Sequence, residues 1–62
     1  MFYIFVQGSY DCTFVGPFAT QSAAEAWIME HRAPQFDYHT QTETDMRENM
    51  REFGDCPIQA PA

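Results

Sequence analysis

The first residues of the chain are apolar at consecutive positions. In an extended strand over residues 2–7, alternate side chains point to opposite faces of a sheet. One face then holds Phe2, Ile4 and Val6, and the other holds Tyr3 and Phe5. A strand with two apolar faces usually lies inside a sheet that is covered on both sides, so this pattern predicts a central strand.

Turn-forming residues follow at 8–11, with the sequence Gly-Ser-Tyr-Asp, and residues 12–16 form a second short apolar segment. Together the two segments predict an antiparallel hairpin with a loop of about four residues. Gly16 and Pro17 are expected to end the second strand.

A first helix is predicted after the hairpin. Its N-cap is either Thr20 or Ser22, and Ser22 has Glu25 three residues later, in capping-box spacing. The helix is expected to end near Arg32, because Pro34 cannot continue it.

One side of this helix is mostly apolar; it carries Ala23, Ala24, Trp27, Ile28 and His31. Trp27 is the predicted anchor of the helix against the hairpin, so we expect Trp27→Ala to unfold the domain. Met29 falls on the opposite side of the helix and is expected to be exposed.

Residues 35–42 alternate and predict a half-buried third strand. Thr44 or Asp45 begins a second helix, in which Asp45 and Glu48 have capping-box spacing, and Gly54 is a natural C-terminal stop. A narrow apolar stripe runs along this helix and consists of Met46, Met50 and Phe53.

The predicted order is β-β-α-β-α, in one α+β domain of residues 1–54 with an extended tail of residues 55–62. The simplest architecture is a three-stranded antiparallel sheet with the Trp27 helix on one face. The other face would carry Tyr3 and Phe5, with Tyr38 as a further candidate. Either the second helix covers this aromatic face, which we favour, or the face is open to a partner.

Acidic residues dominate the charge of the chain. Nine Asp and Glu residues stand against three arginines, and the net charge is −6. Direct binding to nucleic acid or to an anionic membrane is therefore disfavoured, because both need cationic side chains. The charge favours a protein partner with a basic surface, including a nucleic-acid-binding protein, although it also serves solubility alone.

Neither a signal peptide nor an apolar run long enough to cross a bilayer is recognisable. We therefore expect the protein in the cytoplasm, in a bacterial host cell. In a cytoplasmic protein Cys12 and Cys56 are expected to be free thiols rather than a disulfide.

Residues of metal-binding type are present, namely Cys12, His31, His39 and Cys56. No pair of them has the short spacing that is typical of a zinc site. A catalytic set of Cys12, a histidine and Asp37 has no supporting motif, and the glycines have turn or cap roles rather than forming a phosphate loop. We therefore expect no enzyme, no metal and no cofactor.

Residues 15–20, Val-Gly-Pro-Phe-Ala-Thr, are followed by Ala-Glu-Ala at 24–26. This stretch resembles the strand-to-helix junction of SPOR-type peptidoglycan-binding domains. A second related β-α unit, which such domains carry, has no counterpart in this chain. The resemblance is therefore local, and no glycan-binding residue is transferred from it.

Charges are segregated on the predicted second helix. One flank carries Asp45, Glu48 and Glu52, with Asp55 just beyond the helix, and the opposite flank carries Arg47 and Arg51. Neighbouring acids on the flank are about 4.5–6 Å apart along the helix axis, close to the spacing of phosphates along a nucleic-acid strand. Such a row can steer a basic groove, whereas the simpler interpretation is a solvated face with a weak Glu48–Arg51 ion pair.

These patterns predict a small acidic protein-binding inhibitor or regulator, of the kind that phages and mobile elements encode. It would block a basic, nucleic-acid-binding host protein such as a nuclease, a polymerase or a CRISPR-type defence complex. The acids would steer association, and an exposed apolar residue such as Met29 or Tyr10 would anchor the contact. The alternative is a structural or assembly module that forms a homodimer or docks through the aromatic sheet face.

Overall fold

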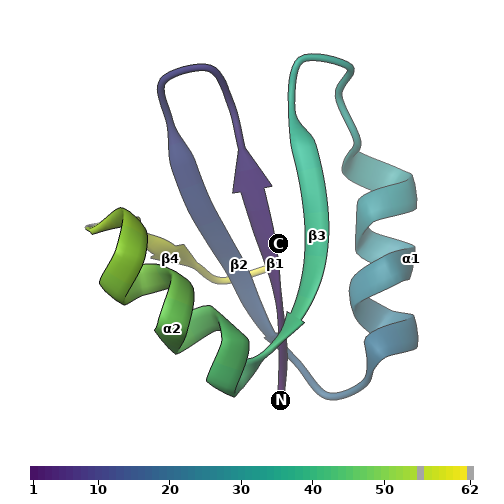
Figure 1. Ribbon diagram of the computed structural model, residues 1–62. Coiled ribbons are helices and arrows are strands. Elements are labelled where there is room, and N and C mark those ends of the chain that lie inside the picture. The colour runs from purple at the N-terminus through teal and green to yellow at the C-terminus, as the bar shows by residue number, and fades with distance from the viewer. Residues whose placement is uncertain (55, 62) are drawn as a thin grey trace.

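The computed structural model describes residues 1–54 and 56–61, with only the backbone of Phe53. The chain forms a small α+β fold of two helices and a four-stranded sheet (Figure 1). In chain order the elements are β1 (Phe2–Gln7), β2 (Cys12–Phe18), α1 (Gln21–His31), β3 (Asp37–Thr42), α2 (Glu43–Phe53) and β4 (Ile58–Gln59).

The strand order is β3-β1-β2-β4, so the prediction that residues 2–7 form an internal strand is confirmed. Strand β1 pairs antiparallel with both β2 and β3, as expected for a hairpin and a third strand. The predicted three-stranded antiparallel sheet is wrong in one respect, because β4 adds a fourth strand parallel to β2. The backbone N–H of Phe14 donates to the Pro57 carbonyl at 2.8 Å, and Ile58 then pairs with Phe14.

Both helices begin at a threonine cap. The Thr20 hydroxyl accepts from the Ala23 N–H at 3.1 Å, so Thr20 rather than Ser22 caps α1. Helix α2 begins earlier than predicted, because the Thr42 hydroxyl accepts from the Asp45 N–H at 3.2 Å. Each helix has 11 residues, and neither is long and apolar enough to span a membrane within the described residues.

The two helices lie on opposite sides of the sheet and bury two apolar clusters (Figure 1). The cluster under α1 is formed by Ile4, Val15, Phe18 and Ala24. The cluster under α2 is formed by Phe5, Phe14, Met46 and Cys56, with Tyr3 and Met50 packed against it. Helix α2 therefore covers the aromatic face, as we favoured, whereas Tyr38 packs on the α1 side.

Trp27 is not the buried anchor that the sequence predicts. The fully buried residue of α1 is Ala24, and Trp27 is only half-buried at the margin of the same cluster. A small side chain lets the helix backbone approach the sheet, so the wide indole ring is displaced to the side of the contact. His31, which was expected on the apolar side, is exposed and stacks on the Trp27 ring.

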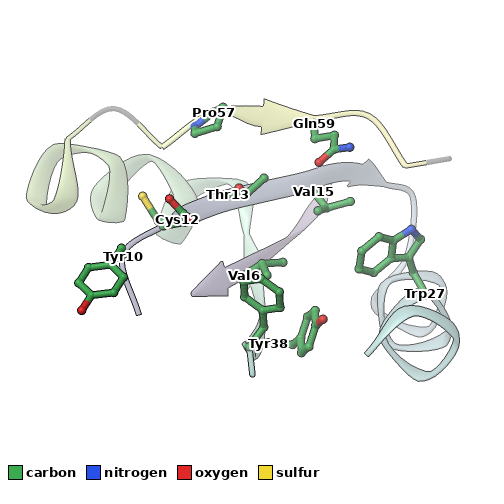
Figure 2. Close-up of a pocket in the computed structure, with 11 residues that line it drawn as sticks. Val6, Tyr10, Cys12, Thr13, Val15, Trp27, Tyr38, Pro57 and Gln59 are labelled. Atoms are coloured by element: carbon green, nitrogen blue, oxygen red, sulfur yellow. The ribbon is translucent and has the colours of Figure 1, made fainter. Parts of the chain in front are cut away.

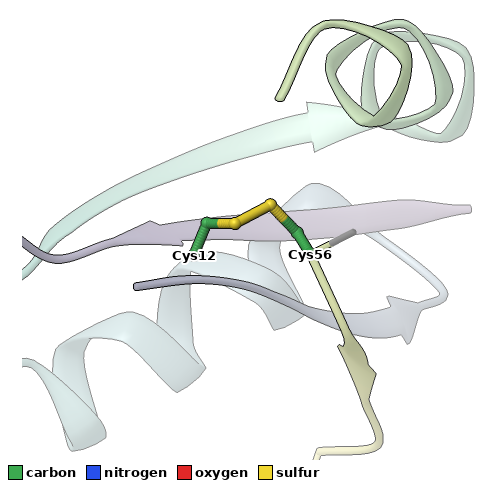
Figure 3. Close-up of a disulfide and its surroundings, with 2 residues drawn as sticks. All are labelled: Cys12 and Cys56. Atoms are coloured by element: carbon green, nitrogen blue, oxygen red, sulfur yellow. A yellow bond between two sulfur atoms is a disulfide. The ribbon is translucent and has the colours of Figure 1, made fainter. Parts of the chain in front are cut away.

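A disulfide joins Cys12 at the start of β2 to Cys56 just before β4 (Figure 3). The expectation of free thiols is therefore wrong. Their Cα atoms lie 5.2 Å apart, which is typical of disulfides, although 44 positions separate the residues in the sequence. The bridge fastens the predicted C-terminal tail to the sheet beside β2.

Strand β2 continues through Gly16 and Pro17 to Phe18, beyond the predicted end. A Cβ atom at the buried Gly16 would lie 2.6 Å from Cδ2 of Tyr3 and 3.1 Å from the Phe2 carbonyl oxygen. We expect Gly16→Ala to lower the free energy of unfolding by about 1–3 kcal/mol, because the neighbouring strand would have to shift. Urea denaturation measures this effect.

The matched control is Ser22→Ala, at an exposed position of α1 that is not its cap. Its urea midpoint should equal that of the unmodified protein. If Gly16→Ala also left the midpoint unchanged, the close packing of Tyr3 against β2 would be contradicted.

Candidate protein-binding surface

Helix α2 presents the predicted acids as a row on its exposed side. Asp45, Glu48 and Glu52 are all exposed, and all lie within one continuous helix. Met46 and Met50 turn the opposite side of the helix toward the sheet, which fixes the direction in which the acids project. We call these three residues the acidic row. Asp55, which the sequence adds to it, lies outside the described residues.

The ion pair of α2 differs from the predicted one. Arg47 Nη2 contacts Glu43 Oε2 at 3.0 Å, across one turn of the helix. Among the described residues this is the ion pair that forms, so the predicted Glu48–Arg51 pair is not made. Arg47 is thereby directed toward the first turn of the helix, and the acidic row has no ion-pair partner in the described part of the chain.

The two proposed apolar anchors are both exposed, Tyr10 to 99% and Met29 to 74%. The structure separates Met29 from the acidic row, because α1 and α2 lie on opposite sides of the sheet (Figure 1). A single flat partner surface therefore cannot contact both. Tyr10 lies in the turn between β1 and β2, at one end of the sheet.

The residues of metal-binding type are not brought together. Both cysteines are joined to each other, His31 is stacked on Trp27, and His39 lies on β3. Within residues 1–54 and 56–61, no three His, Cys, Asp or Glu side chains gather in a group that could hold a metal ion.

An aromatic groove is the feature that the sequence did not predict. It has a volume of about 530 Å³ and lies on the α1 side of the sheet, between α1, the β1–β2 turn and β4. In Figure 2, Tyr38 and Trp27 lie on one side of it, and Gln59 of β4 lies on the other. Its lining comes from every strand, from α1 and from three loops, and no local pattern in the sequence indicates such an assembly.

Comparison of the chain with protein-family models, with curated proteins and with solved structures gave no match. The local resemblance of residues 15–26 to SPOR-type domains thus has no family match to extend it. Function has to be inferred from the surfaces of this chain.

Proposed function

We propose that this protein is a small acidic inhibitor or regulator that acts by binding rather than by catalysis. Its target is a basic, nucleic-acid-binding host protein such as a nuclease, a polymerase or a CRISPR-type defence complex. The chain is of the kind that phages and mobile elements encode. The acidic row occupies the groove in which the target would otherwise hold nucleic acid.

One observation carries this proposal: the acidic row is exposed on one helix, with no ion-pair partner among the described residues. Carboxylates held at fixed spacing raise the local concentration of a cationic partner and speed association by tenfold or more at low salt, on the order of the effect seen for steered complexes. The net charge of −6 adds a long-range attraction of the same sign.

Charge reversal on α2 tests the row. We expect Glu48→Arg with Glu52→Arg to slow association with the captured target by about tenfold or more at about 0.1 M salt, because the steering field is lost. The target is first captured from bacterial lysate with the tagged protein and identified, and association rates are then measured on the purified pair. An added DNA or RNA duplex should compete with the protein for the target.

A matched control changes the same number of charges elsewhere. Glu25→Arg with Glu30→Arg alters two exposed acids of α1, on the other side of the sheet. The net charge is identical in the two variants, so a difference between them reports where the charges lie. The control should slow association much less, because it leaves the acidic row unchanged. Equal slowing by both pairs would show that total charge, and not the acidic row, drives binding.

The bacterial cytoplasm is the proposed location, because such targets lie there. This location requires that the domain be stable in a reducing environment. Cytoplasmic reductants keep most thiols reduced, so the domain would have to remain folded without the Cys12–Cys56 disulfide.

The assembly alternative makes a different prediction for the same capture experiment. Retention that is independent of salt, or self-association alone, would favour a homodimer or a docking module over the acidic inhibitor. A contact through the aromatic face would require α2 to leave it, because Phe5 there is only 5% exposed.

A further inference from the structure

The aromatic groove has walls that are held in place before any ligand arrives. The Trp27 ring stacks on His31 with centroids 4.3 Å apart and meets Phe18 edge-on at 6.5 Å. The Tyr38 hydroxyl accepts from the Ala33 N–H at 3.0 Å and donates to the His31 carbonyl at 3.3 Å. A site with fixed walls loses little conformational entropy when it is occupied.

The third wall is Phe36, which packs against the turn between β1 and β2. A Cβ atom at Gly8 would lie 2.8 Å from Cε1 of Phe36, so only glycine allows this approach. The same turn is closed by a hydrogen bond from the Gly8 N–H to the Asp11 carbonyl at 2.8 Å. Asp11, which is exposed, is one of the residues that line the groove.

The charge of the residues that line the groove indicates which kind of ligand it would bind. Asp11 is the charged residue among the described residues that line the groove, and none of them is basic. The negative faces of aromatic rings attract cations, and a nearby carboxylate adds to that attraction. Val6 and Val15 provide an aliphatic floor, which suits the methylene stem of a long basic side chain.

We propose that the aromatic groove binds an arginine side chain of a partner polypeptide. The guanidinium lies among the rings of Trp27, Phe36 and Tyr38 and next to Asp11, and the stem lies on the valine floor. Arginine fits better than lysine because its planar group stacks on aromatic rings and is weakly hydrated. This inference rests on the proposed function and names a part of the basic partner that docks. Because the groove lies on the α1 side and the acidic row on α2, the arginine belongs to a segment of the partner that reaches around the sheet.

Trp27 is the single tryptophan of the chain, so its fluorescence reports directly on the groove. The probe is a blocked pentapeptide with one central arginine between two valines. The control peptide carries citrulline, which has nearly the shape of arginine without its charge. We expect saturable changes in Trp27 emission with the arginine peptide and binding at least about tenfold weaker with citrulline.

Two variants locate the site. Asp11→Asn should weaken binding of the arginine peptide by about threefold or more, since it removes the carboxylate charge from the groove lining. Glu25→Gln, which removes the same charge at an exposed position of α1 that does not line the groove, should leave binding unchanged. NMR chemical shifts of the backbone amides of Thr13 and Gln59 are followed in the same titrations. They detect binding even if the Trp27 emission does not change.

Equal affinity for the two peptides, no saturable response by either measurement, or an unaltered affinity in Asp11→Asn would overturn this proposal. These outcomes do not involve the acidic row. A groove that binds no arginine, together with slow association of the Glu48→Arg and Glu52→Arg variant, would leave the proposed function standing without this contact. If the groove binds arginine but the Glu48→Arg, Glu52→Arg variant associates as fast as the unmodified protein, the groove contact would stand and the proposed role of the acidic row would fall.

Discussion

Reduction of the Cys12–Cys56 disulfide is expected to lower the free energy of unfolding by about 4 kcal/mol. The bridge closes a loop across 44 positions, and a loop of that length restricts the unfolded chain by roughly this amount. A domain of 62 residues typically has only about 3–9 kcal/mol of total stability. Urea denaturation with and without a reductant measures the difference.

The double variant Cys12→Ser, Cys56→Ser is the control for this experiment. It should resemble the reduced protein in its urea midpoint, and a reductant should change it no further. An equal midpoint for the oxidised and reduced wild-type protein would contradict the expected contribution of the bridge.

The stability of the reduced protein also tests the proposed location. If the reduced domain is folded at 25 °C, it can act in the cytoplasm, and its acidic row remains intact because Met46 still holds α2 against the sheet. If it is unfolded, the protein requires an oxidising compartment, and a cytoplasmic target is excluded. The stability of the domain without its disulfide thus decides whether its target can be a cytoplasmic protein.

Local signals in the sequence were sufficient for most secondary structure. Strand β1 has the predicted bounds, because apolar residues on both of its faces fit only a covered internal strand. Gly54 ends α2 with φ of 81°, a conformation that glycine adopts readily. The start of α2 was misplaced because Thr42 was assigned to the preceding strand, although one residue can end a strand and cap a helix.

Features that depend on contacts between distant residues were not predictable in the same way. Strand β4 has only two residues, Ile58 and Gln59, which are too few for any alternation to be visible. The disulfide requires Cys56 to reach the start of β2, and sequence separation says nothing about that distance. The predicted burial of Trp27 is too high, because side-chain size indicates how much surface a residue could bury and not where the helix axis will lie.

The two parts of the candidate site differ in the same way: the acidic row could be predicted from the sequence, and the aromatic groove could not. The acidic row was predictable because helical periodicity alone places Asp45, Glu48 and Glu52 on one flank. The aromatic groove depends on the β1–β2 turn, the end of α1 and the β4 strand meeting in space. Only the tertiary fold reveals it.

Phe14→Ala is expected to cost about 3–5 kcal/mol, the usual effect of removing a fully buried aromatic ring. Phe14 has no exposed surface and stacks on Phe5 with ring centroids 4.9 Å apart. It also lies on β2 between β1 and β4, so the cavity would open at the centre of the sheet. The variant should be largely unfolded by circular dichroism, and Phe14→Leu should recover much of the loss because leucine refills part of the cavity.

Trp27→Ala is the comparison that decides where the core lies. Trp27 is half-buried, and its Nε1–H is buried without a hydrogen-bond acceptor among the described residues, which offsets part of what its ring contributes. We therefore expect Trp27→Ala to stay folded and to lose about half as much stability as Phe14→Ala, on the same scale of core truncations. Urea midpoints of the two variants give the order directly. A Trp27→Ala protein less stable than Phe14→Ala would mean that the α1 cluster, and not the cluster under α2, holds the domain together.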